Sequence, residues 1–347
     1  MGNSMYVSLA IALLVLMVGC STNQQKPSEL RDTTIAQRSG GNAEPITIRD
    51  SFRLRYTPTS GIELNCVLEQ NETLDQDSLH VRAQTVWYFT QVIEQREPNG
   101  RMRMRMRYDS IRLEQRYWQG DSAAVQVVRY NSARQADRQD ERFDMLTAAI
   151  GKEVRAAISA LGAVEEITGT GQILRALLGG ARADSLTQDQ RKQLEHQLEV
   201  ELYAQALAQQ FLLLPDSPLD SSRTWSRSIP QQIPPLFVAT AKATYRLDSL
   251  ERKQGDSLLL ISAVLDGKIQ LVPEVEKQGV VLRTGTVRGA AQGTLSMHYG
   301  LMVQRSNTVE YAIAAEVSPR KSSREQLRQY RRSVSEFRVQ SVQMRQQ

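Results

Sequence analysis

The sequence predicts an α+β protein that is mainly antiparallel β, with a large curved or two-lobed sheet, one long covering helix and shorter helices. Three observations predict this class. Apolar and polar residues alternate through most of the front half, the pattern of strands with one buried face. Segments of the same kind return after residue 215, and the stretch 187–213 between them has the spacing of one long helix.

The chain begins with a short apolar segment. Residues 7–19 are uncharged, and a run of 13 falls short of the roughly 20 residues of a membrane span, so it fits the core of an export signal. The segment ends in Gly19-Cys20. This ending resembles bacterial lipoprotein signals, in which a small residue precedes a cysteine that is lipidated and becomes residue one. The resemblance implies a signal peptide at 1–19 and lipidation of Cys20; a plain secretory signal and a buried apolar segment are the alternatives.

Residues 20–45 are expected to be the lipidated Cys20 followed by a flexible tether, because the stretch is polar and has no apolar period. Ser21 follows Cys20. The resemblance also implies the proteobacterial sorting pattern, in which a serine at this position favours the outer membrane. We therefore expect a protein anchored in the cell envelope, facing the periplasm or the surface. The remainder, 46–347, is a single β-rich domain, or two lobes (46–180 and 215–347) bridged by the helix 187–213.

Charge and cysteine content narrow the function classes. The chain has 43 Lys and Arg against 38 Asp and Glu, and these charges are dispersed, so we expect no nucleic-acid partner. With Cys20 lipidated, Cys66 has no second cysteine to pair with. The alternation around Cys66 predicts a buried, unreactive side chain.

The front half is expected to form a β meander. Alternation predicts strands at 52–56, 62–68 and 79–93. Glu97-Pro98-Asn99-Gly100 then predicts a hairpin turn, since Asn-Gly readily adopts positive φ. The next strand is 101–113, and its apolar phase changes after Tyr108, which predicts a β-bulge near Asp109.

The strand after this turn alternates arginine and methionine. Met102, Met104 and Met106 share one face, and the other face carries Arg101, Arg103, Arg105 and Arg107. One interpretation is a half-buried strand, with methionines in the core and arginines in solvent or paired with acids of neighbouring strands. The other is an arginine ladder that contacts the anionic groups of phosphate-bearing lipid or polysaccharide.

The middle of the chain contains the helices. We expect a strand at 125–128, a helix at 138–152, a hairpin of 154–158 with 164–167, and a turn at 169–171. The long helix 187–213 begins with a Thr187–Gln190 capping box and ends at Pro215. It is expected to cover an open face of the sheet.

The back half returns to strands. One begins at Trp225, and a hairpin joins 236–247 to 257–265. Further strands are expected at 279–287, 291–304 and 308–317. Apolar residues at helical spacing predict a helix at 321–335.

A second resemblance covers about residues 47–345. It is carried by Ala-Ile-Gly-Lys at 149–152, Leu-Gly-Ala-Val-Glu-Glu-Ile-Thr-Gly at 161–169 and Leu-Leu-Leu-Pro at 212–215. Together with the order of strands and helices, these motifs resemble an uncharacterised family of exported, β-rich bacterial envelope proteins, a domain of unknown function. The resemblance brings no catalytic residues.

We identify no catalytic constellation, no metal site and no cofactor motif. His80, His196 and His298 lie in different elements, and no Gly-x-Ser-x-Gly turn is present. The favoured hypothesis is a non-enzymatic, lipid-anchored envelope protein with a binding or scaffold role, for an amphiphilic ligand or an envelope partner protein. The alternative is an envelope hydrolase acting on cell-wall or glycan substrates through a pair of carboxylates.

Overall fold

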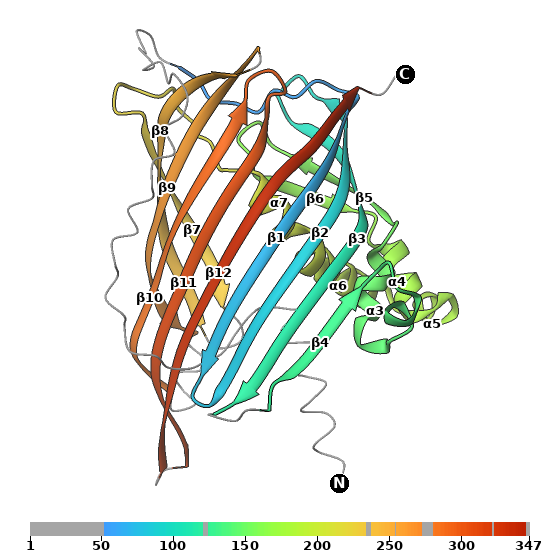
Figure 1. The fold of residues 1–347 in the computed structure, drawn as a ribbon, viewed down its shortest axis with the longest axis vertical. Helices are drawn as coiled ribbons and strands as arrows, with labels where there is room; N and C mark the ends of the chain where they lie inside the picture. The colour runs from blue at the N-terminus through green and yellow to red at the C-terminus, as the bar shows by residue number, and fades with distance from the viewer. Residues whose placement is uncertain are drawn as a thin grey trace.

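The computed structural model describes residues 52–120, 124–233, 237–253, 255–272, 280–320 and 323–344. The expected signal peptide, Cys20 and the tether lie outside this range. In the described part of the chain, antiparallel strands form one 12-stranded sheet in the order β6-β5-β3-β2-β1-β12-β11-β10-β9-β8-β7, and β4 pairs with β3 beside β5. The predicted fold class is therefore confirmed. The sheet curls strongly, and the helices gather against one side of it (Figure 1).

The strands are long. Their bounds are β1 Ile62–Gln76, β2 Leu79–Arg96, β3 Met102–Gln119, β4 Gln126–Asn131, β5 Glu153–Ile158, β6 Val164–Thr168, β7 Thr224–Ile233, β8 Phe237–Lys253, β9 Asp256–Leu271, β10 Val280–Ser296, β11 Leu301–Arg320 and β12 Ser323–Met344. The helical segments are α2 Gln135–Arg138, η1 Glu141–Phe143, α3 Asp144–Ala149, α4 Gly171–Leu178, α5 Gly180–Asp184, α6 Gln188–Leu198, η2 Glu199–Ala204 and α7 Gln205–Gln210.

The alternating pattern sets the two faces of the sheet. Met102, Met104 and Met106 of β3 are buried, at 0%, 0% and 1% exposed, and the arginines between them lie on the opposite, convex face. Cys66 is also buried, as predicted, and this burial raises the pKa of its thiol. The expected β-bulge is present, because Tyr88 pairs with Ser110 and Phe89 with Tyr108, which leaves Asp109 without a partner in β2.

At the β8–β11 side, a second apolar cluster lies on the sheet, with Phe237 from β8, Ile269 from β9, Val287 from β10 and Ile313 from β11. Gly289 of β10 lies close to the backbone of its paired strand β11, since a Cβ there would lie 2.6 Å from the Thr308 carbonyl oxygen.

The segments α6, η2 and α7 form one continuous helix that covers the concave face, as predicted. Its first turn has the predicted capping box, in which Thr187 and Gln190 exchange hydrogen bonds. Its last turn is held by Arg305 of β11, whose guanidinium donates to the carbonyls of Ala208 and Gln209 at 2.6 and 3.1 Å. A cation at this end also complements the helix dipole.

A buried pair of amides joins this helix to the sheet. Gln91 of β2 and Gln210 of α7 are both 0% exposed, and each donates to the other, at 2.6 and 2.8 Å. Gln91 occupies an inward position where the alternation of β2 leads one to expect an apolar residue. The reciprocal bonds satisfy both amides and thereby fix where the helix ends on the sheet.

This pairing predicts a non-additive pair of substitutions. Gln91→Leu or Gln210→Leu alone should lower the free energy of unfolding by about 1–3 kcal/mol, because each removes both bonds of the pair and leaves a buried amide with, at most, the weak 3.7 Å contact that Gln91 accepts from the Cys66 thiol. The double variant removes both polar groups and should lie within about 1 kcal/mol of wild type. Urea denaturation of all four proteins measures the coupling; additive losses would contradict the argument.

Several front-half expectations need correction. Residues 52–56 form no regular strand; Phe52 makes an isolated bridge to Leu219, and the Tyr56 amide donates to the Ala160 carbonyl at 2.9 Å. The expected helix 138–152 divides into α2, η1 and α3 and ends at Ala149. The long helix ends at Gln210, before Pro215, because Phe211 takes an extended conformation and Tyr56 hydrogen-bonds the Leu212 backbone.

The prediction of a C-terminal helix was wrong, because the segment forms strand β12. Residues 321–335 were expected to be helical, but β12 lies between β1 and β11 and is paired with both. Backbone hydrogen bonding along both edges outweighs the helical spacing of its apolar residues. Phe337 and Ser335 are buried, whereas Glu336 and Arg338 are exposed, which is the two-residue period of a strand.

The boundaries at 279–317 were also wrong. Three strands were expected there, and the structure has two, β10 and β11, which pair with each other. The expected breaks between these strands lay near residues 289 and 306, where glycine and polar residues are typical of turns. They lie within strands, and the chain reverses between Ser296 and Leu301 instead.

Candidate functional site

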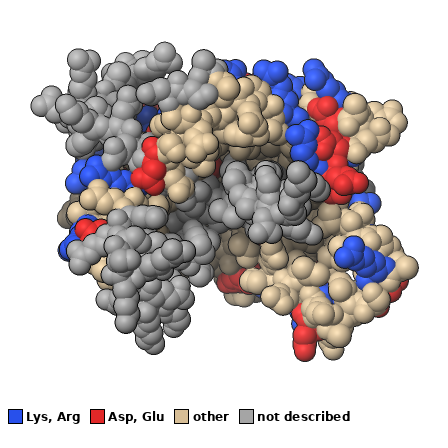
Figure 2. Space-filling view, turned by 90° about the horizontal axis from the view of Figure 1, so that it is seen from below, with Lys and Arg blue, Asp and Glu red and all other residues tan. Residues whose placement is uncertain are grey.

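The four arginines predicted as an anion contact each have an acidic partner. Arg101 pairs with Glu165 at 2.8 Å and Arg103 with Glu97 at 2.7 Å. Arg105 and Arg107 pair with Glu153 at 3.1 Å and Asp109 at 2.9 Å. Basic and acidic side chains likewise lie beside one another on the face seen in Figure 2. Exposed pairs contribute about 0–1 kcal/mol each, so a polyanion could compete for these arginines, and the anion contact stays a prediction.

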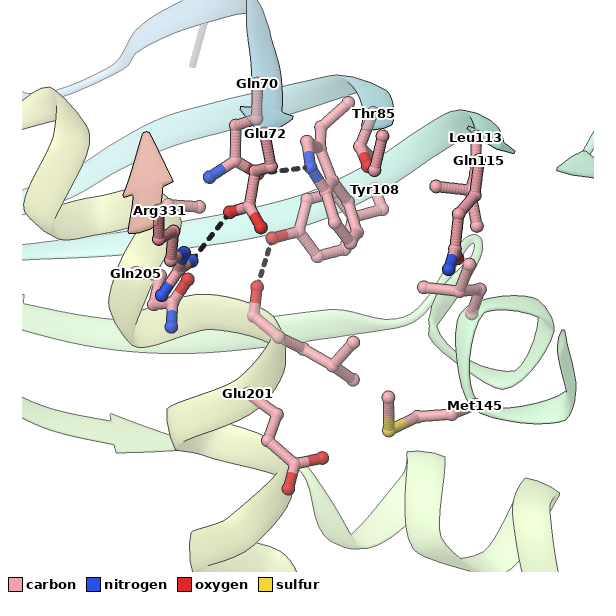
Figure 3. A pocket seen from close by; sticks show the side chains of 15 residues that line it. Gln70, Glu72, Thr85, Tyr108, Leu113, Gln115, Met145, Glu201, Gln205 and Arg331 are labelled. Atoms are coloured by element: carbon pink, nitrogen blue, oxygen red, sulfur yellow. Dashed lines mark hydrogen bonds and ion pairs between the residues drawn. The ribbon is translucent and has the colours of Figure 1, made fainter. Parts of the chain in front are cut away.

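A different region collects polar side chains on the concave face. Between the covering helix and the sheet lies a pocket, here called the inner pocket (Figure 3). Its polar and aromatic lining comes from β1, β2, β3, β12, η2 and α7: Gln70, Glu72, Thr85, Trp87, Tyr108, Gln115, Glu201, Gln205 and Arg331. Leucine, alanine and methionine side chains complete the wall.

On the sheet side, most of these groups are already paired. Arg331 of β12 donates to Glu72 of β1 at 2.9 Å, and both side chains are largely buried. The Trp87 indole donates to the Gln70 side-chain oxygen at 2.8 Å. Dashed lines in Figure 3 mark these contacts. The ion pair and the indole bond therefore form a fixed polar wall.

On the helix side, the wall is the π-helical segment η2. The Tyr108 hydroxyl of β3 donates to the carbonyl of Leu202 in η2, and the Tyr108 ring stacks on Tyr203 at 5.0 Å. Both tyrosines are buried, and burial raises the pKa of each hydroxyl. π-Helical turns are rare and often occur at functional sites. Glu201 of this turn borders the inner pocket, and its carboxylate points away from the sheet-side wall (Figure 3).

Glu201 is a pocket carboxylate with a shifted pKa. Burial raises the pKa of Glu201, and a hydrogen bond from the Gln197 amide, at 2.7 Å, opposes the rise. Among the described residues, no Lys, Arg or His forms an ion pair with it. Desolvation without a nearby cation disfavours the charged form.

Gln115 of β3 also lines the inner pocket, and the residue is 6% exposed. Its side-chain amide is not among the fully buried polar groups that lack a hydrogen-bond partner, so it does not by itself require a bound molecule.

The size of the inner pocket limits what it can hold. Its volume is about 60 Å³, room for a few water molecules or one small polar group. Drug-sized ligands need about 300–1,000 Å³, so a whole acyl chain does not fit there. Next to the pocket the concave face is filled by the side chains of one large apolar cluster.

Replacing Glu201 tests its ionisation state. A carboxyl whose folded pKa is raised loses stability as pH rises from its unfolded pKa through its folded pKa. Wild type should therefore become less stable over that window, and Glu201→Gln should not. At pH 8 the variant should be more stable by less than about 1 kcal/mol, because solvent screens a partly exposed group. Thermal unfolding from pH 4 to 8 measures this; a variant less stable than wild type at pH 8 would contradict it.

Sequence reasoning did not find the inner pocket. Glu72, Gln115, Glu201 and Arg331 are far apart in the chain and belong to no motif. One signal was present: Gln70, Glu72 and Gln115 are polar residues at positions that the strand period turns inward. Because residues 321–335 were predicted to be helical, Arg331 was not expected on the concave face. Its place in strand β12 brings it there.

Two further observations concern the described residues. No group of three or more His, Cys, Asp and Glu side chains among them is placed to hold a metal ion. None of the helices in the described ranges combines the length and apolar content needed to cross a membrane.

The fold and the pocket define an α+β protein with one curved antiparallel sheet, a covering helix and a small polar cavity between them. Residues 99–299, more than half of the chain, match the model described as "Family of unknown function (DUF6263)", and the chain belongs to that family. No curated protein matches the sequence.

Three solved structures are similar to parts of the fold. Lipovitellin, from a study of its lipid–protein interactions, shares 8% identity over 84% of this chain, with a TM-score of 0.43, and the match spans only 26% of the lipovitellin chain. An outer membrane channel from Pseudomonas putida F1 shares 8% identity, covering 82% of this chain and 97% of the channel, with a TM-score of 0.20. The translocator domain of the autotransporter NalP from Neisseria meningitidis shares 4%, covering 81% and 88%, with a TM-score of 0.20. At these values the matches carry no inference about function.

Proposed function

We propose that this protein is a non-enzymatic, lipid-anchored protein of the bacterial cell envelope that binds the polar head of an amphiphilic ligand. Cys20 carries the lipid and residues 21–45 form the tether, which places the domain beside the membrane, most consistently the outer membrane. Two or three acyl chains at about 0.8 kcal/mol per buried CH₂ would hold it there durably.

The observation that carries the binding role is the inner pocket. It is roofed by an irregular helix turn, and it has a pre-formed polar wall in which Arg331 is paired with Glu72 and Trp87 with Gln70. Its small volume supports recognition of a head group rather than transport of a whole lipid.

The anchor is tested by metabolic labelling. Cells expressing the full chain are grown with a radioactive fatty acid, and the wild type is compared with Cys20→Ala. We expect label in the wild type, its loss in the variant and release of the variant from the membrane fraction. Equal labelling of the two proteins would refute the anchor.

The binding role is tested by what remains bound. The full chain is extracted from membranes in mild detergent and examined by native mass spectrometry, followed by release and identification of small molecules. We expect a stoichiometric small amphiphile. A protein that carries nothing, and that takes up nothing from a total lipid extract, would refute ligand binding and leave a scaffold role.

One observation favours hydrolysis as a second candidate. Two carboxylates line the inner pocket in different environments: Glu72 is paired with Arg331, whereas burial raises the pKa of Glu201. Such a division is typical of acid and base pairs in glycosidases. Turnover of cell-wall glycans that disappears in Glu201→Gln would establish this candidate, and absence of turnover over a substrate panel would remove it.

A further inference from the structure

A second depression, here called the outer depression, lies on the convex face of β8, β9, β10 and β11. Its volume is about 170 Å³, against about 60 Å³ for the inner pocket. Gln304 and Ser306 place it on this face, because they pair with Arg338 and Glu336 of β12, which are exposed there. Its lining residues include Asp248, Leu260, Gln292, Thr294, Gln304 and Ser306.

Strand pairing brings four uncharged polar side chains together in this depression. Gln292 of β10 pairs with Ser306 of β11, and two residues further on Thr294 pairs with Gln304. Directly paired residues have Cβ atoms about 4.5–5.5 Å apart, and residues two apart on a strand share a face. Among the described residues, the structure gives none of these four side chains a hydrogen-bond partner. Their donors and acceptors are therefore open to a ligand.

Irregularities in two strands flank this group. In β8 the register shifts between Leu247 and Ser249, which leaves Asp248 without a partner in β9. In β11 Val303 likewise has no partner in β10. Bulges of this kind bend a strand and redirect its side chains, and they are frequent beside functional sites.

The charge at the outer depression is balanced. One carboxylate oxygen of Asp248, Oδ1, accepts from the Arg246 guanidinium at 2.6 Å and from the Ser262 hydroxyl at 3.1 Å. Its other oxygen has no hydrogen bond within the described ranges and stays open as an acceptor. No Lys, Arg or His lines the depression in the part of the chain that the structure describes. The lining therefore favours neither an anion nor a cation.

We propose that the outer depression binds one uncharged sugar ring. A sugar hydroxyl both donates and accepts hydrogen bonds, and so do the amides of Gln292 and Gln304 and the hydroxyls of Thr294 and Ser306. The open oxygen of Asp248 accepts from a further hydroxyl. The volume of about 170 Å³ is below the range of about 300–1,000 Å³ for drug-sized ligands and suits a single ring. This site is separate from the inner pocket and goes beyond the proposed function.

A peptide is a less suitable occupant. Extended peptides commonly bind by adding a strand to an open sheet edge, where backbone hydrogen bonds supply the affinity. The strand that carries Gln292 and Thr294 has no open edge there, because β10 pairs with both β9 and β11. A ligand of the outer depression must therefore be held by side chains, as sugar hydroxyls are.

The test is saturation-transfer difference NMR of the full-length protein in a polyoxyethylene detergent, which has no sugar head group. The probes are the methyl glycosides of glucose, galactose, mannose and N-acetylglucosamine. Cyclohexanol, a ring of similar size with one hydroxyl, is the matched probe. We expect at least one glycoside to bind with a Kd of about 1 mM or tighter, and at least tenfold more tightly than cyclohexanol. No saturable binding of any glycoside, or equal binding of cyclohexanol, would overturn the proposal.

Variants connect the binding to the outer depression. Gln292→Leu and Gln304→Leu should each weaken binding of the best glycoside about two- to tenfold, the loss of a neutral hydrogen bond, and the double variant should weaken it further. Gln270→Leu is the matched control, because Gln270 is an exposed amide of β9 outside the lining, and it should bind like wild type. A double variant that binds like wild type, or an equal loss in Gln270→Leu, would refute the site. Circular dichroism of each variant verifies folding.

The sugar ring can belong to an envelope polysaccharide or to a free sugar, and a second titration distinguishes these sources. An oligosaccharide of the preferred sugar that binds at least tenfold more tightly than its methyl glycoside assigns a polysaccharide. Equal binding of the two assigns a free sugar. Both results support a sugar site, and neither depends on what the inner pocket binds.

Discussion

Met104→Ala should lower the free energy of unfolding by about 2–5 kcal/mol, the range for truncating a fully buried large side chain. Met104 is 0% exposed, and β3 lies between β2 and β5 at this position, where Met104 pairs with Ile93 and Ala156. The loss combines the transfer of apolar surface to water with the cavity that remains. The midpoint of urea denaturation measures it, provided that the slope of the transition is unchanged.

The neighbouring residue is the matched control. The Arg103 side chain is 53% exposed on the convex face, and its partner is Glu97 at 2.7 Å. Arg103→Ala should cost less than about 1 kcal/mol, since an exposed ion pair contributes little. Equal losses at the two positions would mean that the alternation of β3 does not divide a core face from a solvent face.

Gly162→Ala should be the other strongly destabilising change, with a loss of about 2–5 kcal/mol from unfavourable φ and overpacking together. Gly162 has a φ of +88°, and a Cβ there would lie 2.3 Å from the Leu212 carbonyl oxygen and 2.8 Å from the Tyr56 ring. The first atom belongs to the backbone just after the covering helix. The β5–β6 hairpin and the helix exit would have to separate, and thermal unfolding should show a large fall in Tm.

Gly151→Ala isolates the contribution of φ. Gly151 has a φ of +72°, and a Cβ there would meet nothing within 4 Å. This variant should lose only about 1–2 kcal/mol, the cost of a left-handed conformation in a residue with a Cβ. A Gly162→Ala variant no less stable than Gly151→Ala would show that the contact with Leu212 does not constrain the fold.

Local patterns predicted the elements that depend on local physics. The alternation of Met102 to Met106 set the faces of β3, and Asn99-Gly100 marked its turn. The change of phase at Tyr108 predicted the bulge at Asp109, and Thr187 with Gln190 predicted the start of the covering helix. Each of these signals acts between residues close in sequence, so one sequence is enough to detect it.

Elements decided by distant neighbours were not predicted. β12 has apolar residues at helical spacing, but β1 and β11 provide partners for its backbone along both edges. Gln91 and Gln210 resemble ordinary polar residues, and only their approach across 119 positions makes them a satisfied buried pair. Tertiary context outweighs local propensity wherever a segment is paired on both sides or a polar group finds a remote partner.

The sequence by itself determined the class of the fold, the faces of the front strands and the expectation of a lipid anchor at Cys20, because these depend on periodicity and on contiguous motifs. The tertiary structure alone decided the inner pocket. Glu72, Gln115, Glu201 and Arg331 come together only when the sheet curls and the helix crosses it. Contacts between residues so far apart are set by the packing of whole elements, and no local pattern encodes them.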